Sequence, residues 1–193
     1  MGTRNLTAVF VDGEYKVAQY GQWDGYPEGQ GMTCLTFARN FLVNKADREA
    51  FADKLRACSW ITQEEIDNIN NQIRSDGIKK WALIWPELSR DTGAEILELV
   101  AKSENGLKLQ NNIEFAADSL FCEWAWVIDL DAGTFEGYRG FNQTTDLTPE
   151  DRFYFLVAKQ KGEYNAITLA AKWSLDDLPD KDTFLAAFKE DDE

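Results

Sequence analysis

The chain has 193 residues, of which 44% are apolar, and it carries a formal net charge of -14 with no histidine. This length and composition predict a single folded domain over residues 1–193, with a short acidic tail at 190–193. The missing histidine excludes Ser-His-Asp and Cys-His nucleophile systems, and the negative charge argues against binding nucleic acid through its phosphates.

The sequence predicts a cytoplasmic protein. No apolar run is long enough to span a bilayer, and the N-terminus lacks the charged and apolar regions of a signal peptide, so we expect no membrane partner. Cys34, Cys58 and Cys122 are odd in number and widely spaced. This usage favours reduced, packed thiols over disulfides or a zinc site, and we expect no metal and no cofactor.

The first predicted elements are two strands, over residues 5–11 and 14–20. They meet at Asp12-Gly13, a dipeptide that suits the positive φ of a tight hairpin turn. The first strand places apolar residues on both of its faces. We therefore expect this strand to be covered on both sides.

A glycine-rich loop over residues 20–31 follows the hairpin and has the composition of a binding site. Its four glycines allow positive φ and a close approach of the backbone to a ligand. Its aromatic rings offer flat surfaces, and its amide and carboxylate groups offer directional hydrogen bonds. In the alternative interpretation, the glycines serve turns and the rings close the end of the core. The predicted ligand-binding residues of this loop are Tyr20, Gln22, Trp23, Asp24, Tyr26 and Glu28.

Helical periodicity dominates the section after the loop. Asn44 is a suitable N-cap, Thr62 and Glu65 form a capping-box pattern, and Thr92 and Glu95 repeat that pattern. The predicted helices cover residues 32–43, 45–58, 62–77 and 92–105.

Strands return in the C-terminal half. Asp129, Asp131 and Glu136 resemble a calcium loop only superficially, because the bidentate Glu of such a loop stands much further on, and a hairpin turn is the preferred interpretation. A third hairpin is predicted around Lys161-Gly162. The predicted strands cover residues 123–130, 134–139, 153–160 and 166–173, and a last helix covers 179–188.

These elements predict an α+β fold of antiparallel hairpins with inserted helices. Because the strands are apolar on both faces, the favoured arrangement is two sheets packed beneath helical layers, a four-layer αββα sandwich. The alternative is a single antiparallel sheet covered by helices. Strand topology does not follow from pattern alone.

The N-terminus resembles that of the N-terminal nucleophile hydrolases of the choloylglycine hydrolase and penicillin V acylase type. The similarity covers residues 1–4, Met-Gly-Thr-Arg, and the Trp-Asp pair at residues 23–24, where that family has Met-Cys-Thr-Arg and an Asp-Trp pair. The resemblance implies a four-layer fold and an amidohydrolase whose terminal nucleophile uses its own α-amine as base. The family's cysteine is replaced by Gly2, so Thr3 would become the nucleophile only after removal of two residues. The Gly-Thr-Arg start and the loop also resemble uncharacterised small proteins of tailed phages.

Two arginines at strand ends complete the candidate site. Arg4 stands at the head of the first strand, and we hypothesise that it forms with Asp24 either a charge pair that orders the loop or the positive and negative groups of a small-ligand pocket. An ordinary surface ion pair is the alternative. Arg139 is a further ligand-binding candidate. The candidate catalytic residues, should the protein be an enzyme, are Thr3, Arg4 and Asp24.

Two classes of function follow from this reading of the sequence. The first is a small-molecule-binding protein with its site in the glycine-rich loop, related to a degenerate N-terminal nucleophile hydrolase. The second is an acidic interaction or inhibitor protein of a phage or mobile element, whose charge steers a basic protein partner. The expected partner is a small molecule in the first class and a basic protein in the second.

Overall fold

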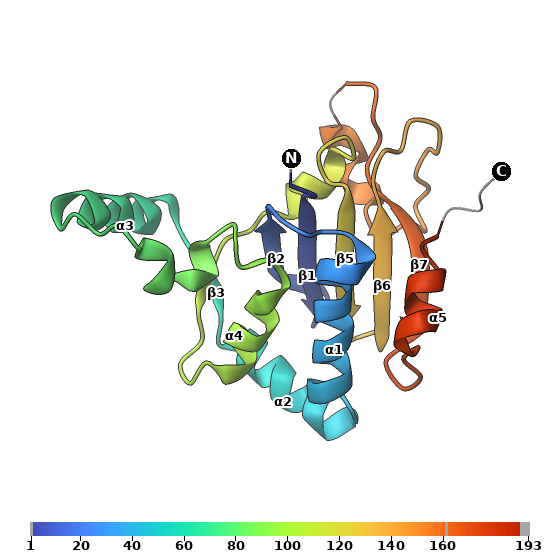
Figure 1. Cartoon of the computed structure of the whole chain (residues 1–193), viewed down its shortest axis with the longest axis horizontal. Coiled ribbons are helices and arrows are strands. Elements are labelled where there is room, and N and C mark those ends of the chain that lie inside the picture. The colour runs from blue at the N-terminus through green and yellow to red at the C-terminus, as the bar shows by residue number, and fades with distance from the viewer. Residues whose placement is uncertain (1, 161, 190–193) are drawn as a thin grey trace.

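The computed structural model describes residues 2–160 and 162–189 and shows an α+β fold. Its centre is a five-stranded sheet with the strand order β2-β1-β5-β6-β7 (Figure 1). A second sheet pairs two short strands, β3 (Ser59–Trp60) and β4 (Lys108–Leu109). The strands of the main sheet are β1 (Asn5–Val11), β2 (Glu14–Gly21), β5 (Trp124–Asp129), β6 (Thr134–Arg139) and β7 (Thr168–Ser174).

The main sheet is mixed. Neighbouring strands are antiparallel except β1 and β5, which are parallel. A parallel pair needs a crossover connection, and here the crossover contains all the helices from α1 to α4. The two stacked sheets of a four-layer αββα sandwich therefore do not form among the described residues. The single sheet of the alternative prediction does form, but with one parallel pair.

The first hairpin and two of the helix starts are confirmed. Asp12 and Gly13 have φ values of 55° and 77° at the β1-β2 turn. The Asn44 side chain accepts hydrogen bonds at the start of α2, and Thr62 and Glu65 form a reciprocal capping box at α3. The helices are α1 (Met32–Phe41), α2 (Lys45–Arg56), α3 (Gln63–Ser75), α4 (Ile96–Lys102) and α5 (Lys181–Ala186).

The capping pattern at Thr92 does not cap a helix. The Thr92 hydroxyl donates a hydrogen bond to the backbone oxygen of Pro86 instead. A short 3-10 segment, Gly93–Glu95, comes next, and α4 begins only after it. The hydroxyl therefore stabilises the preceding turn, and no side chain caps α4.

Two hydrophobic cores lie on opposite faces of the sheet. The front face, covered by α1, α2, α4 and α5, buries Trp126, Phe135 and Phe184 completely (Figure 1). The back face is covered by 3-10 segments and carries smaller residues, including Ala8 and Val127. The strands are apolar on both faces because one sheet is covered on both sides. The same sequence pattern would also fit two stacked sheets, so the pattern alone did not distinguish the two arrangements.

The predicted strand at residues 153–160 is wrong. This stretch contains a 3-10 segment, Tyr154–Lys159, and β7 pairs with β6 instead. Phe153 and Leu156 are buried whereas Tyr154 and Phe155 are exposed. This spacing of three residues is helical, and it places the segment against the back face. The predicted turn at Lys161-Gly162 lies partly outside the described residues, and the acidic tail at 190–193 lies wholly outside them.

Candidate functional site

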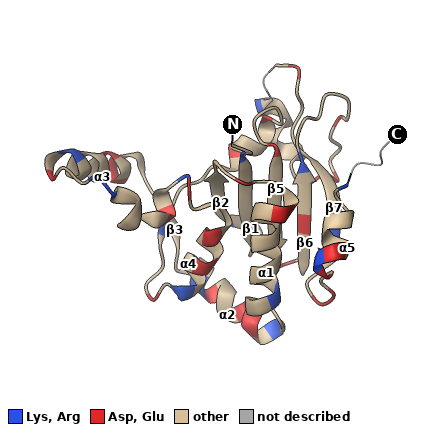
Figure 2. Ribbon diagram, in the orientation of Figure 1, with Lys and Arg blue, Asp and Glu red and all other residues tan. Residues whose placement is uncertain are grey.

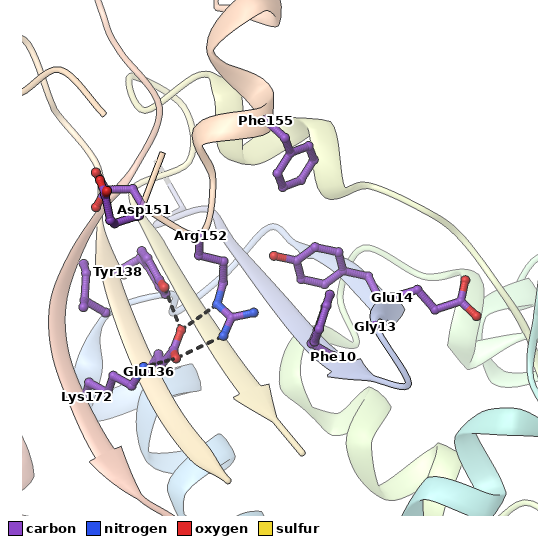
Figure 3. A pocket seen from close by; sticks show the side chains of 12 residues that line it. Phe10, Gly13, Glu14, Glu136, Tyr138, Asp151, Arg152, Phe155 and Lys172 are labelled. Carbon is purple, nitrogen blue, oxygen red and sulfur yellow. Dashed lines mark hydrogen bonds and ion pairs between the residues drawn. The ribbon is translucent and has the colours of Figure 1, made fainter. Parts of the chain in front are cut away.

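A pocket of about 530 Å³ opens on the back face of the sheet, between the β1-β2 hairpin, β6, β7 and residues 150–155. This volume is in the range of small-molecule sites, roughly 300–1,000 Å³. Its side chains come from four segments of the chain, and the hairpin is distant in sequence from the other three (Figure 3). We call it the Arg152 pocket, after the residue at its floor.

Side chains of β6 form the floor of the Arg152 pocket. Alternation along a strand places Thr134, Glu136 and Tyr138 on the back face. Glu136 lies opposite Val127 of β5 and Lys172 of β7 in the two strand pairings. The floor therefore has one carboxylate at its centre, with other polar groups beside it.

Glu136 is held by several donors at once. Arg152 donates from Nε to Oε2 over 2.7 Å and from Nη2 to Oε1 over 3.1 Å. The Tyr138 hydroxyl donates over 2.6 Å and the Thr134 hydroxyl over 2.9 Å, and Lys172 Nζ lies 3.1 Å from Oε1. Burial without such partners would be costly, so these donors are what keep the carboxylate in place.

Arg152 is the cation that compensates the buried carboxylates. Besides Glu136, it binds Asp129 through Nη2. Only 15% of the Arg152 side chain is exposed, against 6% for Asp129 and 2% for Glu136. Together with Asp129, which lies beneath the lining residues, and with Lys172, the floor cluster contains two cations and two anions, so its formal charges balance.

The pKa values follow from this arrangement. Burial by itself would raise the pKa of Glu136, but the hydrogen bonds from Arg152 and Tyr138 outweigh it and bring that pKa to about 2. Burial, followed by the charge of Glu136, raises the pKa of Tyr138. Glu136 is therefore ionised and fully bonded near neutral pH, which makes it part of a fixed floor rather than a general base.

Acidification is expected to remove the stability that Glu136 supplies. The pKa of Glu136 in the folded protein is about 2, which lies below its usual value of 4.5. Its contribution to stability is therefore complete above pH 4.5 and is lost as the pH falls toward 2. The shift corresponds to about 3 kcal/mol, of which about 2 kcal/mol should disappear between pH 7 and pH 3. Urea unfolding at both pH values measures the loss. An equal loss in Glu136→Gln would contradict this assignment.

Aromatic rings form the walls of the Arg152 pocket. Phe10 and Tyr15 meet edge to face with their centroids 5.1 Å apart, and Tyr15 lies 6.2 Å from Phe155. The Arg152 guanidinium carbon lies 5.4 Å from the Phe10 centroid. Phe155 is 53% exposed and stands at the mouth (Figure 3). A flat molecule entering the pocket would therefore meet ring surfaces.

The Tyr15 hydroxyl is the donor that the walls offer to a ligand. Arg152 donates to Glu136 and Asp129 through Nε and Nη2, and it also interacts with the Tyr15 side chain. Burial raises the pKa of Tyr15, and the charge of Arg152 opposes this rise without cancelling it. The hydroxyl therefore stays protonated near neutral pH. Glu14, Glu150 and Asp151 give the rim a negative charge, which Lys16 reduces by pairing with Glu14 over 2.5 Å.

The structure places the predicted loop residues elsewhere. Trp23 and Tyr26 are 46% and 39% exposed, so their rings do not close the core. Tyr26 donates a hydrogen bond to Asp24 over 3.2 Å, and Glu28 is exposed. Tyr20 donates to Gln22 over 2.7 Å. None of the loop residues lines the Arg152 pocket.

The N-terminal candidates do not converge on Asp24. Arg4 Nε lies 3.5 Å from Glu123 Oε1, and its guanidinium carbon lies 4.6 Å from the Phe121 centroid. The hypothesised pair between Arg4 and Asp24 is thus replaced by a pair with Glu123. Thr3 contributes its backbone oxygen, which accepts a hydrogen bond from Gly25 over 2.9 Å.

Arg139 lies on the front face of the sheet, away from the Arg152 pocket. Its guanidinium carbon is 5.4 Å from the Trp124 ring centroid. Strand alternation explains this position, because Arg139 and Glu136 are an odd number of residues apart on β6. The side chain therefore cannot act together with the floor of the pocket.

Sequence reasoning missed the residues that build the Arg152 pocket. Arg152 and Phe155 fall in or beside a stretch predicted as a strand, and Tyr15 reads as an ordinary strand aromatic. The polar alternation of Thr134, Glu136 and Tyr138 was the one available signal, because a buried strand with one polar face needs a polar partner.

Comparison with protein-family models, with curated proteins and with solved structures finds no match. The single main sheet also differs from the four-layer fold that a resemblance to N-terminal nucleophile hydrolases implies. Over residues 2–160 and 162–189, no three or more Cys, Asp or Glu side chains gather as metal ligands would. In that same part of the chain, every helix is too short or too polar to cross a membrane.

Proposed function

We propose that the protein binds a small planar molecule in the Arg152 pocket. The observation that carries this proposal is the combination of aromatic walls with an ionised, fully bonded floor in a cavity of about 530 Å³. Binding sites commonly join an apolar lining to a few placed polar groups. The protein would then bind a small molecule, as the sequence predicts, but in the Arg152 pocket rather than in the glycine-rich loop.

The walls favour a ring-shaped ligand. Phe10, Tyr15 and Phe155 present faces and edges at centroid separations of 5.1 and 6.2 Å. Stacking on such rings contributes about 0.5–1.5 kcal/mol beyond the burial of apolar area. An aliphatic chain of equal size would gain only the free energy of burying apolar area.

The polar groups favour a ligand with a carbonyl acceptor and no phosphate. The Tyr15 hydroxyl, which lies beside Arg152, can donate to an acceptor that reaches the floor. The floor charges balance, whereas Glu14, Glu150 and Asp151 at the rim would repel an anionic tail. A neutral or cationic heterocycle with a carbonyl group, such as a nucleobase, combines these properties.

The chemistry of the floor supports binding rather than catalysis. Glu136 accepts hydrogen bonds from three side chains and is paired with Lys172, so it has no free position for a substrate proton. A pKa of about 2 also makes it a weak base at neutral pH. The cysteines do not supply a nucleophile, since burial raises the pKa of Cys34 to about 12.

Guanosine and guanosine monophosphate provide a matched pair of probes. A ligand of this size that gains about 0.3 kcal/mol per non-hydrogen atom would bind with a Kd of tens of micromolar. Calorimetric titration should show guanosine binding at least about fivefold more tightly than its monophosphate, because the rim is acidic. Tighter binding of the monophosphate would contradict the charge argument.

Phe155→Ala tests the position of the site, and Tyr154→Ala is its matched control. Both rings are exposed and adjacent in sequence, but only Phe155 lines the Arg152 pocket. Loss of the wall ring should weaken guanosine binding about tenfold, while the control should bind as the wild type does. Equal affinity in all three proteins, or no guanosine binding by the wild type, would overturn the proposal.

A further inference from the structure

Two exposed aromatic side chains lie at the end of the main sheet opposite to the β1-β2 turn. Trp23 and Tyr26 follow the end of β2 and are 46% and 39% exposed. Soluble proteins scatter single exposed apolar residues, but a Trp and a Tyr on one tight loop are the residue types enriched at binding hot spots. This pair is separate from the Arg152 pocket.

The loop holds these rings on a strained backbone. Asp24, between them, has a φ of 54°, and the other described non-glycine residues with positive φ are Asp12 in the hairpin turn and Phe141. The backbone oxygen of Asp24 accepts a hydrogen bond from the Gln30 amide over 2.7 Å. Gly29 packs so closely that a Cβ at that position would lie 2.2 Å from the same oxygen. Strain of this kind persists only where the surroundings enforce it, and it gathers at binding sites.

Hydrogen bonds with buried groups hold the same loop in place. The Trp126 indole donates to the Gly25 oxygen over 2.9 Å, and the Gly25 amide donates to Thr3 over 2.9 Å. Asn5, completely buried, donates to the Trp23 oxygen over 3.3 Å. A loop fixed by the core loses little conformational entropy when a partner binds.

Carboxylates surround the two rings. The Trp23 indole donates to Asp91 over 2.8 Å, and the Tyr26 hydroxyl donates to Asp24 over 3.2 Å. Glu28 is exposed beside them, and Asp91 forms a long, exposed ion pair with Arg90, with 4.0 Å between Oδ1 and Nε. Elsewhere, acidic and basic residues are interspersed along the helices (Figure 2). Aromatic faces next to carboxylates suit a guanidinium or an ammonium group.

We propose that Trp23, Asp24, Tyr26, Glu28 and Asp91 form a docking surface for a protein partner that presents arginine or lysine side chains. A basic side chain would lie against the Trp23 ring and pair with Asp24 or Asp91. The net charge of -14 favours the approach of such a partner. The carboxylates exclude nucleic acid as the occupant, since they would repel its phosphates.

Selection from a displayed library of random 12-residue peptides tests this surface. The wild-type protein serves as bait, with excess soluble Trp23→Ala variant present to remove peptides that bind elsewhere. The enriched peptides should contain more arginine and lysine than the input library. Enriched peptides without this excess, or the absence of any enrichment, would overturn the proposal.

Matched variants then assign the binding to individual side chains. Asp24→Asn removes the charge, and asparagine tolerates a positive φ. The melting temperature of this variant should therefore match that of the wild type. It should weaken a selected peptide about tenfold, as should Trp23→Ala. Glu104→Gln makes the same change of charge at another exposed site, and it should alter affinity less than about twofold. Equal losses in Asp24→Asn and Glu104→Gln would show that only net charge matters. Phe155→Ala should leave peptide binding unchanged, which separates this surface from the Arg152 pocket.

Discussion

Arg152→Met is expected to destabilise the protein by about 3–5 kcal/mol, because removing one partner of a buried ion pair leaves its counter-charges uncompensated. Asp129 and Glu136 are almost completely buried, and Arg152 donates to both. Unfolding in urea, with the midpoint and slope compared between variant and wild type, measures the loss.

Lys172→Met is the control for this prediction. Lys172 also contacts Glu136, at 3.1 Å, but its side chain is 48% exposed. An exposed ion pair contributes about 1 kcal/mol or less, so this variant should be only slightly less stable than the wild type. If Arg152→Met were no more destabilising than Lys172→Met, the balanced floor of the Arg152 pocket would not depend on Arg152.

Trp126→Ala should also cost about 3–5 kcal/mol, the usual range for truncation of a buried large aromatic side chain. Trp126 is completely buried and contacts the rings of Trp124, Phe184 and Phe188 at centroid distances of 5.2–5.8 Å. The measurement is again the free energy of unfolding in urea. Because its indole also donates to Gly25, the substitution should loosen the docking surface as well.

Trp126→Phe separates the packing of the ring from its hydrogen bond. It retains most of the aromatic volume but deletes the indole N–H, so a smaller loss of about 1–3 kcal/mol is expected from the unsatisfied Gly25 oxygen. A loss equal to that of Trp126→Ala would mean that the hydrogen bond, rather than packing, dominates. Full stability in both variants would contradict the buried aromatic core.

Local signals in the sequence were sufficient for much of the first half of the fold. Asp12-Gly13 predicted the hairpin because few dipeptides accept positive φ at both positions. Asn44 and the pair Thr62 and Glu65 predicted helix starts, because their side chains satisfy backbone amides within three residues. Such interactions depend only on near neighbours in the chain.

The arrangement of the sheet depends on distant residues and could not be predicted in this way. The parallel pairing of Asn5 with Trp124 joins strands separated by the whole helical section. The run at Phe153 to Phe155 has the composition of a strand, yet burial of Phe153 and Leu156 against the back face makes it a 3-10 segment. In both cases tertiary packing overrides the local pattern.

The same distinction between neighbouring and distant residues applies to the two candidate sites. Composition singles out the exposed loop around Trp23 and Asp24 as a candidate, because its residues are contiguous, and its role in binding stays a prediction. The Arg152 pocket could not, since Tyr15, Glu136 and Phe155 meet only after β1 has paired with β5 and β6 with β7. A pocket made from separate strands leaves no continuous motif in the sequence.

The central claim is that the Arg152 pocket holds a planar ligand against aromatic walls. Solution NMR of the protein saturated with guanosine tests it most directly, through nuclear Overhauser effects between base protons and protein side chains. We predict contacts from the guanine ring to the ring protons of Tyr15 and Phe155. Guanosine that binds with contacts only to other residues, such as Trp23 and Tyr26, would contradict the claim.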